Sequence, residues 1–213
     1  MTALRAGLAV ALALLGCASQ PARTRPDPLA PPAHLSRAGA STRSAGPAPV
    51  SPPAVARAVD AATALVGSRS IVVDGVDYGA GCAALVRAAF VRAGRPLPGD
   101  VLDARALMAY ADRHGALTRG RRAAPGDLLF LADRPGGPVE HVGIVARTEP
   151  DGTLVVLHRV ARGVRRVRVN LAYPDRTTDP ATGRHINDTL LVSSRQVVAG
   201  SLVVGLSDLL RHG

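Results

Sequence analysis

Apolar positions in the first part of the chain beyond residue 52 recur at helical spacing. Residues 53–66 place apolar side chains every three to four positions, which predicts an amphipathic helix. Residues 82–94 repeat this pattern, with Gly94 as a helix stop. A third helix is expected over residues 103–114, because Asp103 is a favourable N-cap.

From residue 125 onward the pattern changes to that of strands. Short apolar or alternating runs occupy residues 128–131, 140–147, 153–160 and 163–170. A polar loop is expected over residues 171–187. The apolar tail, residues 197–210, is expected to cover one side of the sheet. These elements predict an α+β fold, in which an N-terminal helical layer packs on a mostly antiparallel β-sheet.

The N-terminal segment has the features of an export signal. Residues 1–17 combine a basic start with a short apolar run that ends in Leu-Leu-Gly-Cys. This ending resembles a bacterial lipobox, which implies lipid attachment at Cys17; a plain secretory signal is the alternative. Ala18 follows the cysteine, which by the same resemblance points to the periplasmic face of the outer membrane. Residues 18–54, rich in Pro, Ala and Ser, are expected to form a disordered tether to one domain over residues 55–213.

The net positive charge of the chain indicates which binding partners are candidates. The chain has a net charge of +10, and all its basic residues other than histidine are arginine. Arginine binds carboxylates and phosphates, so anionic lipid or the carboxylates of peptidoglycan are candidate partners. Nucleic acid is not expected, because the chain has an export signal, only 2% aromatic residues and no recognised binding motif. An arginine-rich solvated surface without a specific partner explains the charge equally well.

Cys82 is the main candidate for chemistry. It is the only cysteine besides Cys17, so it has no partner for an internal disulfide, and packing or reactivity must explain it. Its place in the first turn of a predicted helix favours the thiolate, the nucleophilic form. A thiolate nucleophile also needs a base, for which His141 is the leading candidate, and a third polar group to orient that base. His158, on the next predicted strand, is the expected third group, with His185 as an outside alternative.

The turn between the two histidine strands decides whether their rings meet. A two-residue loop at Pro150 and Asp151 would place residue 143 opposite His158 and bring His141 and His158 to the same face. A three-residue loop that includes Gly152 would shift the register by one residue and turn His158 away. The sequence leaves both arrangements open.

These motifs together resemble the NlpC-type cell-wall hydrolases and their CHAP relatives. The resemblance covers roughly residues 60–192 and rests on a cysteine at the head of a helix, Pro-Gly-Asp-Leu-Leu-Phe, His-Val-Gly-Ile-Val and a histidine on the following strand. It implies a compact papain-like fold and a cysteine peptidase or amidase that cleaves peptidoglycan stem peptides through an acyl-enzyme. Endopeptidase activity is favoured. Cys82 matches the nucleophile, His141 the base and His158 the third residue.

The chain departs from this family around the nucleophile, where Gly81-Cys82-Ala83-Ala84 replaces Asp-Cys-Ser-Gly. Tyr78 and Arg159 are weaker candidates for substrate binding. Neither a metal nor an organic cofactor is expected, since the histidines lack close ligand spacing. The alternative to a lipid-anchored hydrolase is a catalytically inactive lipoprotein that uses the same fold to bind cell-wall fragments or a protein partner.

Overall fold

The computed structural model describes residues 53–118, 120 and 122–212. The expected signal segment, Cys17 and nearly all of the expected tether lie outside these residues. The helices are α1 (Pro53–Ala64), α2 (Cys82–Arg92), α3 (Ala104–Arg113), the short 3₁₀-helix η1 (Ala199–Leu202) and α4 (Leu209–His212). The strands are β1 (Val72–Val73), β2 (Val76–Asp77), β3 (Leu117–Thr118), β4 (Leu128–Ala132), β5 (Val139–Thr148), β6 (Leu154–Val160), β7 (Gly163–Val169), β8 (Thr189–Val192), β9 (Arg195–Val198) and β10 (Val203–Ser207).

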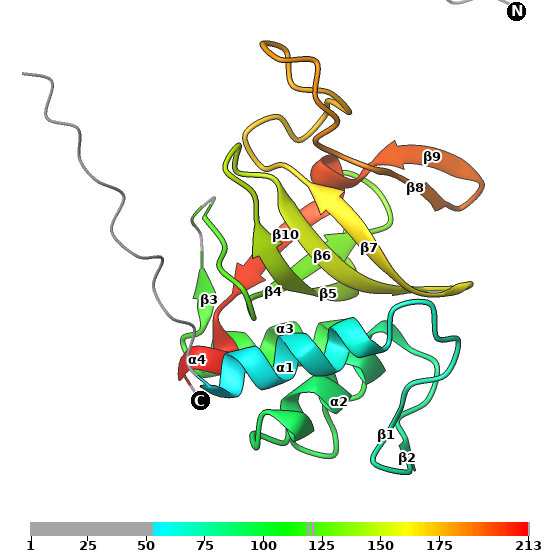
Figure 1. Ribbon diagram of the computed structural model, residues 1–213, viewed down its shortest axis with the longest axis vertical. Coiled ribbons are helices and arrows are strands. Elements are labelled where there is room, and N and C mark those ends of the chain that lie inside the picture. The colour runs from blue at the N-terminus through cyan, green and yellow to red at the C-terminus, as the bar shows by residue number, and fades with distance from the viewer. Residues whose placement is uncertain (1–52, 119, 121, 213) are drawn as a thin grey trace, which may run out of the picture. The chain divides into compact units, whose positions relative to one another are not determined.

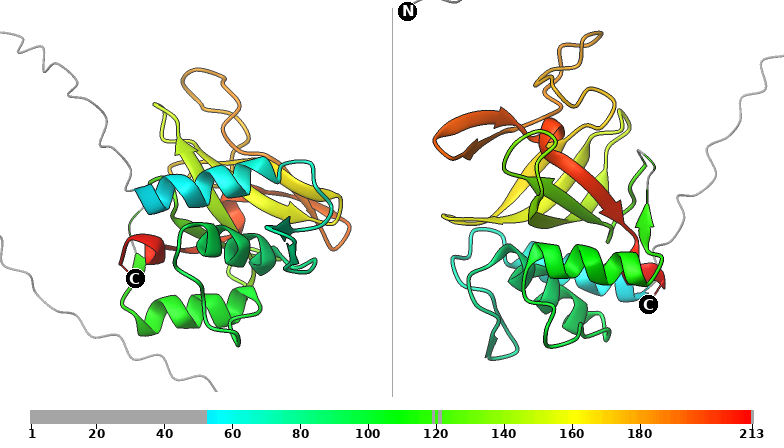
Figure 2. Two further views of the ribbon diagram at one scale, coloured as in Figure 1. Left: turned by 60° about the horizontal axis from the view of Figure 1, so that its bottom comes forward. Right: turned by 180° about the vertical axis from the view of Figure 1, so that it is seen from behind.

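Six strands form one sheet in the order β3-β10-β4-β5-β6-β7, and every neighbouring pair is antiparallel. Two short hairpins, β1–β2 and β8–β9, stand apart from this sheet. Helices α1, α2 and α3 lie together on one side of it, as Figures 1 and 2 show. The prediction of an α+β fold with helices packed on a mostly antiparallel sheet is confirmed.

Residues close to each helix end determine where the helix begins and stops. Helix α2 begins at Cys82, as predicted, and Gly94 beyond its end has a φ of 76°, which favours glycine. The Asp103 side chain accepts a hydrogen bond of 2.8 Å from the Ala106 N–H and so caps α3. Within the described part of the chain, no helix combines the length and apolar character needed to span a membrane.

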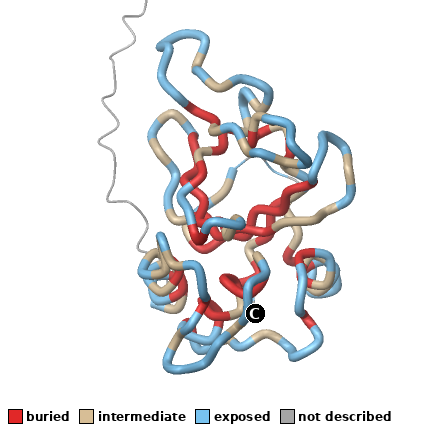
Figure 3. Tube along the Cα trace, turned by 90° about the vertical axis from the view of Figure 1, so that its right-hand side faces the viewer, coloured by how far each residue is buried: buried red, intermediate tan, exposed pale blue. Residues whose placement is uncertain are grey.

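Apolar side chains fill both faces of the sheet. Phe130 and Ile144 belong to the core between the sheet and the helices, where Leu85 of α2 meets them. Leu131 and Val145, one position along each strand, belong to a second core on the opposite face. Figure 3 shows the buried stretches along the strands and on the helices beside them. Because both faces are covered, β4 is apolar throughout and does not alternate.

The C-terminal tail differs from the prediction. Residues 197–210 do not simply cover one side of the sheet, because β10 enters the sheet between β3 and β4. The part that precedes it, with Ala199 and Leu202 of η1, packs on the face opposite the helices, while Leu209 and Leu210 beyond β10 belong to the core on the helix side. A segment laid across a face would bury backbone N–H and C=O groups without partners, whereas pairing on both sides satisfies those of β10.

Candidate active site

Cys82 lies where the backbone favours an anion. It is the first residue of α2, and the N-cap residue Gly81 has no side chain to cap the helix. The first hydrogen bond at this end joins the Ala84 N–H to the Gly81 carbonyl at 3.1 Å, which leaves the N–H groups of Cys82 and Ala83 available. The thiol is free and partly exposed. This position stabilises negative charge on the sulfur or on a group bound beside it.

His141 on β5 lies beside this sulfur. Hydrogen bonding to Cys82 is the largest influence on His141 and raises its pKa above the ordinary value, against the opposing effect of partial burial. The Cys82 Sγ atom also lies 3.8 Å from the Glu140 carbonyl oxygen, on the residue before His141. The structure therefore brings together two of the three residues that the sequence singles out for catalysis.

The second ring nitrogen of His141 has a carboxylate partner. Its Nε2 atom lies 2.7 Å from Oδ1 of Asp133, in the loop between β4 and β5, which leaves Nδ1 for the sulfur side. The hydrogen bond and the charge of Asp133 both add to the rise in the pKa of His141. Both side chains are partly open to solvent, with exposed fractions of 37% for His141 and 47% for Asp133. Cys82, His141 and Asp133 thus form a nucleophile, base and orienting acid in series.

The β5–β6 hairpin combines features of both expected turns. Its loop has three residues, because the Glu149 N–H bonds the Thr153 carbonyl at 2.8 Å around residues 150–152. A bulge between Val145 and Arg147 then restores the register, so Gly143 faces His158. The rings of His141 and His158 consequently lie on one face, with their centroids 5.5 Å apart and their planes at 80°.

His158 does not hold the position that the sequence predicts for it. The hydrogen bond that orients His141 comes from Asp133, and neither ring nitrogen of His158 has a hydrogen-bond partner among the described residues. The side chain is only 3% exposed. Burial, together with the neighbouring His141, lowers the pKa of His158 to about 4, so the ring is neutral at physiological pH. The two rings meet edge to face, and no hydrogen bond joins them.

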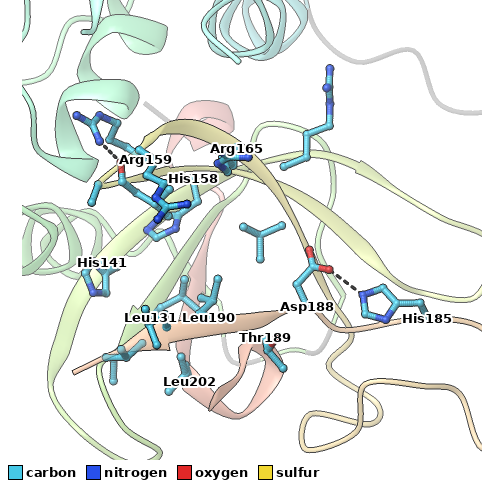
Figure 4. Close-up of a pocket in the computed structure, with 18 residues that line it drawn as sticks. Leu131, His141, His158, Arg159, Arg165, His185, Asp188, Thr189, Leu190 and Leu202 are labelled. Atoms are coloured by element: carbon cyan, nitrogen blue, oxygen red, sulfur yellow. Dashed lines mark hydrogen bonds and ion pairs between the residues drawn. The ribbon is translucent and has the colours of Figure 1, made fainter. Parts of the chain in front are cut away.

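Beside the two histidines lies a cavity of about 790 Å³ on the sheet face opposite the helices. Its wall runs from His141 and His158 along β7 to the β8–β9 hairpin, as Figure 4 shows. Cys82 does not line it and approaches His141 from the helix side instead. A ligand in this cavity would therefore meet His141 and His158 on the side away from α2.

The two weaker candidates lie in different places. Tyr78 packs against the core between the sheet and the helices and does not line the cavity. Arg159 does line it, but its guanidinium donates to the Arg69 carbonyl at 2.8 Å and to the Val160 carbonyl. These backbone contacts hold the Arg159 side chain in place and occupy several of its donors.

Sequence reasoning missed Asp133. The acid directly follows the apolar strand β4. Leu131 pairs with His141 across β4 and β5, so an acid two positions beyond Leu131 is within reach of the imidazole. This position, just beyond the strand residue that faces His141, is the signal that could have identified Asp133. His185, the outside alternative, bonds Asp188 at 2.7 Å on the far side of the cavity and does not contact His141.

Among the described residues, no cluster of three or more histidine, cysteine or acidic side chains is arranged to hold a metal ion. The side chains of this site themselves offer a sulfur nucleophile, an imidazole that accepts and returns a proton, and a carboxylate that keeps the imidazole oriented.

Comparisons with known proteins give distant matches. No family model and no curated protein matches the chain. It is similar to the crystal structure of an NlpC/P60 family protein from Bacillus cereus, with 17% identity over 76% of this chain and 42% of that one and a TM-score of 0.45. It is also similar to the crystal structure of Ly7917, with 19% identity over 71% of this chain and 61% of that one and a TM-score of 0.43. The chain thus spans less than two thirds of either protein. Both TM-scores are below 0.5, so neither likeness carries a conclusion about function.

Proposed function

We propose that this protein is a cysteine hydrolase that cleaves peptide or amide bonds of peptidoglycan. The observation that carries the proposal is the place of Cys82, at the start of α2 with its Sγ atom 3.8 Å from the Glu140 carbonyl oxygen, next to His141, whose Nε2 atom lies 2.7 Å from Asp133. In this proposal Cys82 is the nucleophile, His141 the acid and base, and Asp133 the positioning residue. His158 is left out of the proton path because the ring has no hydrogen bond to His141.

The reaction follows from these roles. The Cys82 thiolate attacks the carbonyl carbon, and the N–H groups at the start of α2 stabilise the resulting oxyanion. The His141 imidazolium gives its proton to the departing amine as the carbon–nitrogen bond breaks, which leaves a thioester on Cys82. His141 then takes a proton from water, whose oxygen attacks the thioester. The carbon–sulfur bond then breaks and the new carboxylic acid departs, which restores the Cys82 thiolate and the His141 imidazolium.

The choice of peptidoglycan rests on the sequence motifs. Pro-Gly-Asp-Leu-Leu-Phe, His-Val-Gly-Ile-Val and a cysteine at a helix start occur together in NlpC-type hydrolases, which act on this polymer. The expected lipid at Cys17 would hold the domain near the cell wall, on the periplasmic face of the outer membrane. Of the two reaction types, we favour an endopeptidase that acts on stem peptides.

Clearing of purified sacculi in a zymogram tests the proposal. We expect the wild-type protein to clear, Cys82→Ala to lose the activity, and alkylation with iodoacetamide to abolish it as well. The matched control is Cys17→Ala, which removes the other cysteine and leaves the described site intact. Equal clearing by the wild type and Cys82→Ala, or clearing that survives complete alkylation, would contradict a thiol mechanism.

Co-sedimentation with sacculi, measured beside the zymogram, separates the hydrolase from the alternative, an inactive lipoprotein that binds wall fragments. The altered Gly81-Cys82-Ala83-Ala84 surroundings favour this second function. An inactive binder would co-sediment with sacculi equally well as the wild type and as Cys82→Ala, with no muropeptides released by either. For an active enzyme, mass spectrometry of the released muropeptides identifies the bond that is cut.

A further inference from the structure

We propose that the cavity under the β8–β9 hairpin is a substrate subsite. In it, His158 and Arg165 bind a carboxylate on a short aliphatic peptide. This inference rests on the proposed function, since it places part of the substrate beside the catalytic pair. It assigns His158 a role in binding rather than in proton transfer. Three features of the cavity support it: a buried ring and a cation that have no partner among the described residues, and an apolar wall.

The first feature is the His158 ring. It is 3% exposed and lines the cavity, yet neither of its nitrogens has a hydrogen-bond partner among the described residues. A buried polar group without a partner costs free energy, and a ligand that bonds it removes that cost. The neutral ring offers one donor and one acceptor. Its N–H fits a carboxylate oxygen.

The second feature is Arg165. It lies directly opposite His158 across β6 and β7, so both side chains stand on the same face of the sheet, and Figure 4 shows them together. Arg165 has no carboxylate within ion-pair distance in the described part of the chain. The carboxylate of the same cavity, Asp188, is already bonded to His185 and to the Arg168 N–H. Arg165 is therefore available to an anion from outside.

The third feature is the opposite wall. Leu131 of β4, Leu190 of β8 and Leu202 of η1 line it, and all three belong to or pack against the second core. This apolar wall favours small aliphatic side chains next to the anion. A volume of about 790 Å³ is within the range of small-molecule sites and accommodates a peptide of a few small residues.

The distance between this subsite and His141 predicts which bonds the enzyme prefers. The His141 and His158 rings are 5.5 Å apart, which corresponds to about two residues of extended chain. A carboxylate held at His158 would thus lie within about two residues of His141, the base that serves the attacked bond. The enzyme is then expected to cut close to a free carboxylate and to neglect bonds far from one.

Binding to the full-length Cys82→Ala protein tests the subsite without any need for turnover. The probes are N-acetyl-alanyl-alanine, in its D,D and L,L forms, and the corresponding C-terminal amides, titrated by calorimetry. We expect one acid form to bind about tenfold or more tightly than its amide. Arg165→Gln should remove this preference, whereas Arg195→Gln, the same charge change on the β8–β9 hairpin outside the cavity lining, should preserve it.

Nitrogen chemical shifts of the histidine rings provide a second readout, since a carboxylate at His158 shifts its ring signals and leaves those of His114 unchanged. Equal binding of acid and amide, a preference that survives Arg165→Gln, or no binding of any probe would overturn the subsite. Inorganic phosphate that binds as tightly as the dipeptide acid would overturn the peptide class. Because binding is measured on Cys82→Ala, a protein that clears sacculi but fails these tests refutes the subsite alone.

Discussion

At the residue scale, two histidines on adjacent strands experience opposite environments. His141 is partly exposed between a sulfur and a carboxylate, both of which raise its pKa. His158, one strand away, is buried with no hydrogen-bond partner in the part of the chain that the structure describes, and its pKa falls to about 4. Near neutral pH the first ring is thus suited to hold a proton for a leaving group, while the second stays neutral. Two residues of the same type perform different tasks because one is solvated and paired and the other is not.

Replacing Asp133 with Asn should change the pH dependence of catalysis. Asp133 raises the pKa of His141 through a hydrogen bond and through charge, and Asn removes the charge. The imidazolium should therefore lose its proton at lower pH, which moves the alkaline limb of the kcat/KM profile to lower pH. We also expect kcat to fall by about 10²-fold. The measurement is a pH–rate profile, with Asp112→Asn on the exposed surface of α3 as control. An alkaline limb that does not move would exclude Asp133 as the positioning residue.

Buried His158 should make the fold sensitive to acid. Its pKa is depressed from 6.5 to about 4 in the folded state, so the unfolded chain binds more protons between these values. Stability contributed by the neutral ring is complete above pH 6.5 and is lost as pH falls toward 4, by about 3 kcal/mol. Urea unfolding at pH 7 and pH 4 measures this loss.

The comparison protein for this measurement is His158→Gln, which has no group that titrates in this window. We expect it to lose less stability on acidification than the wild type does. His141 is present in both proteins, so its contribution, which changes as pH rises through its raised pKa, cancels in the comparison. Identical losses in the two proteins would mean that His158 is not buried in its neutral form.

At the scale of elements, the β5–β6 hairpin controls where the catalytic and binding residues face. A three-residue loop by itself would offset the strands by one residue, but the bulge at Ala146 cancels that offset. His141, Gly143 and His158 therefore share one face, and the core between the sheet and the helices keeps Val142 and Ile144 on the other. Cavity, catalytic base and core all depend on this register.

Gly143 is the residue on which the hairpin packs most closely. A Cβ atom there would lie 2.5 Å from Cγ1 of Val156 and 2.8 Å from the Leu157 carbonyl oxygen. Gly143→Ala should thus lower the free energy of unfolding by about 1–3 kcal/mol and reduce activity through displacement of His141. Urea unfolding checks this, with Gly99→Ala as control because its Cβ meets open space. A Gly143→Ala protein as stable as the control would contradict the close approach of the strands.

Elements that depend on local chemistry were predictable, and those that depend on distant partners were not. Asp103 caps α3 and Cys82 begins α2 because capping, helix spacing and glycine stops act within a few residues. The tail was mistaken because apolar spacing does not say whether a segment lies on a sheet or within it. The place of β10 depends on β3 and β4, which lie more than 70 residues earlier in the chain.

At the scale of the whole molecule, the proposed lipid anchor and the proposed active site are separate features of one chain. Cys17 lies outside the described residues, and Cys82 lies within the folded part. We predict that Cys17→Ser shifts the protein from the membrane fraction to the soluble fraction of its native cell, because one acylated cysteine supplies the attachment. Fractionation and immunoblotting measure the shift. Activity of the purified variant on sacculi should be unchanged.

The reciprocal control is Cys82→Ala, which should remain in the membrane fraction and lose activity. Each cysteine is thus tested against the other. A Cys17→Ser protein that stays with the membrane would contradict the lipobox and favour attachment by another route, such as the arginine-rich surface.

The sequence by itself determined the α+β class, the helix that begins at Cys82 and the strand that carries His141, because helical spacing, capping and strand patterning are read from neighbouring residues. Only the tertiary structure decided which group orients His141, how a bulge restores the hairpin register, and why His158 is neutral. The physical reason is that hydrogen-bond partners and burial depend on residues brought together from separate strands. The pattern along one segment does not show which residues of other segments lie beside it.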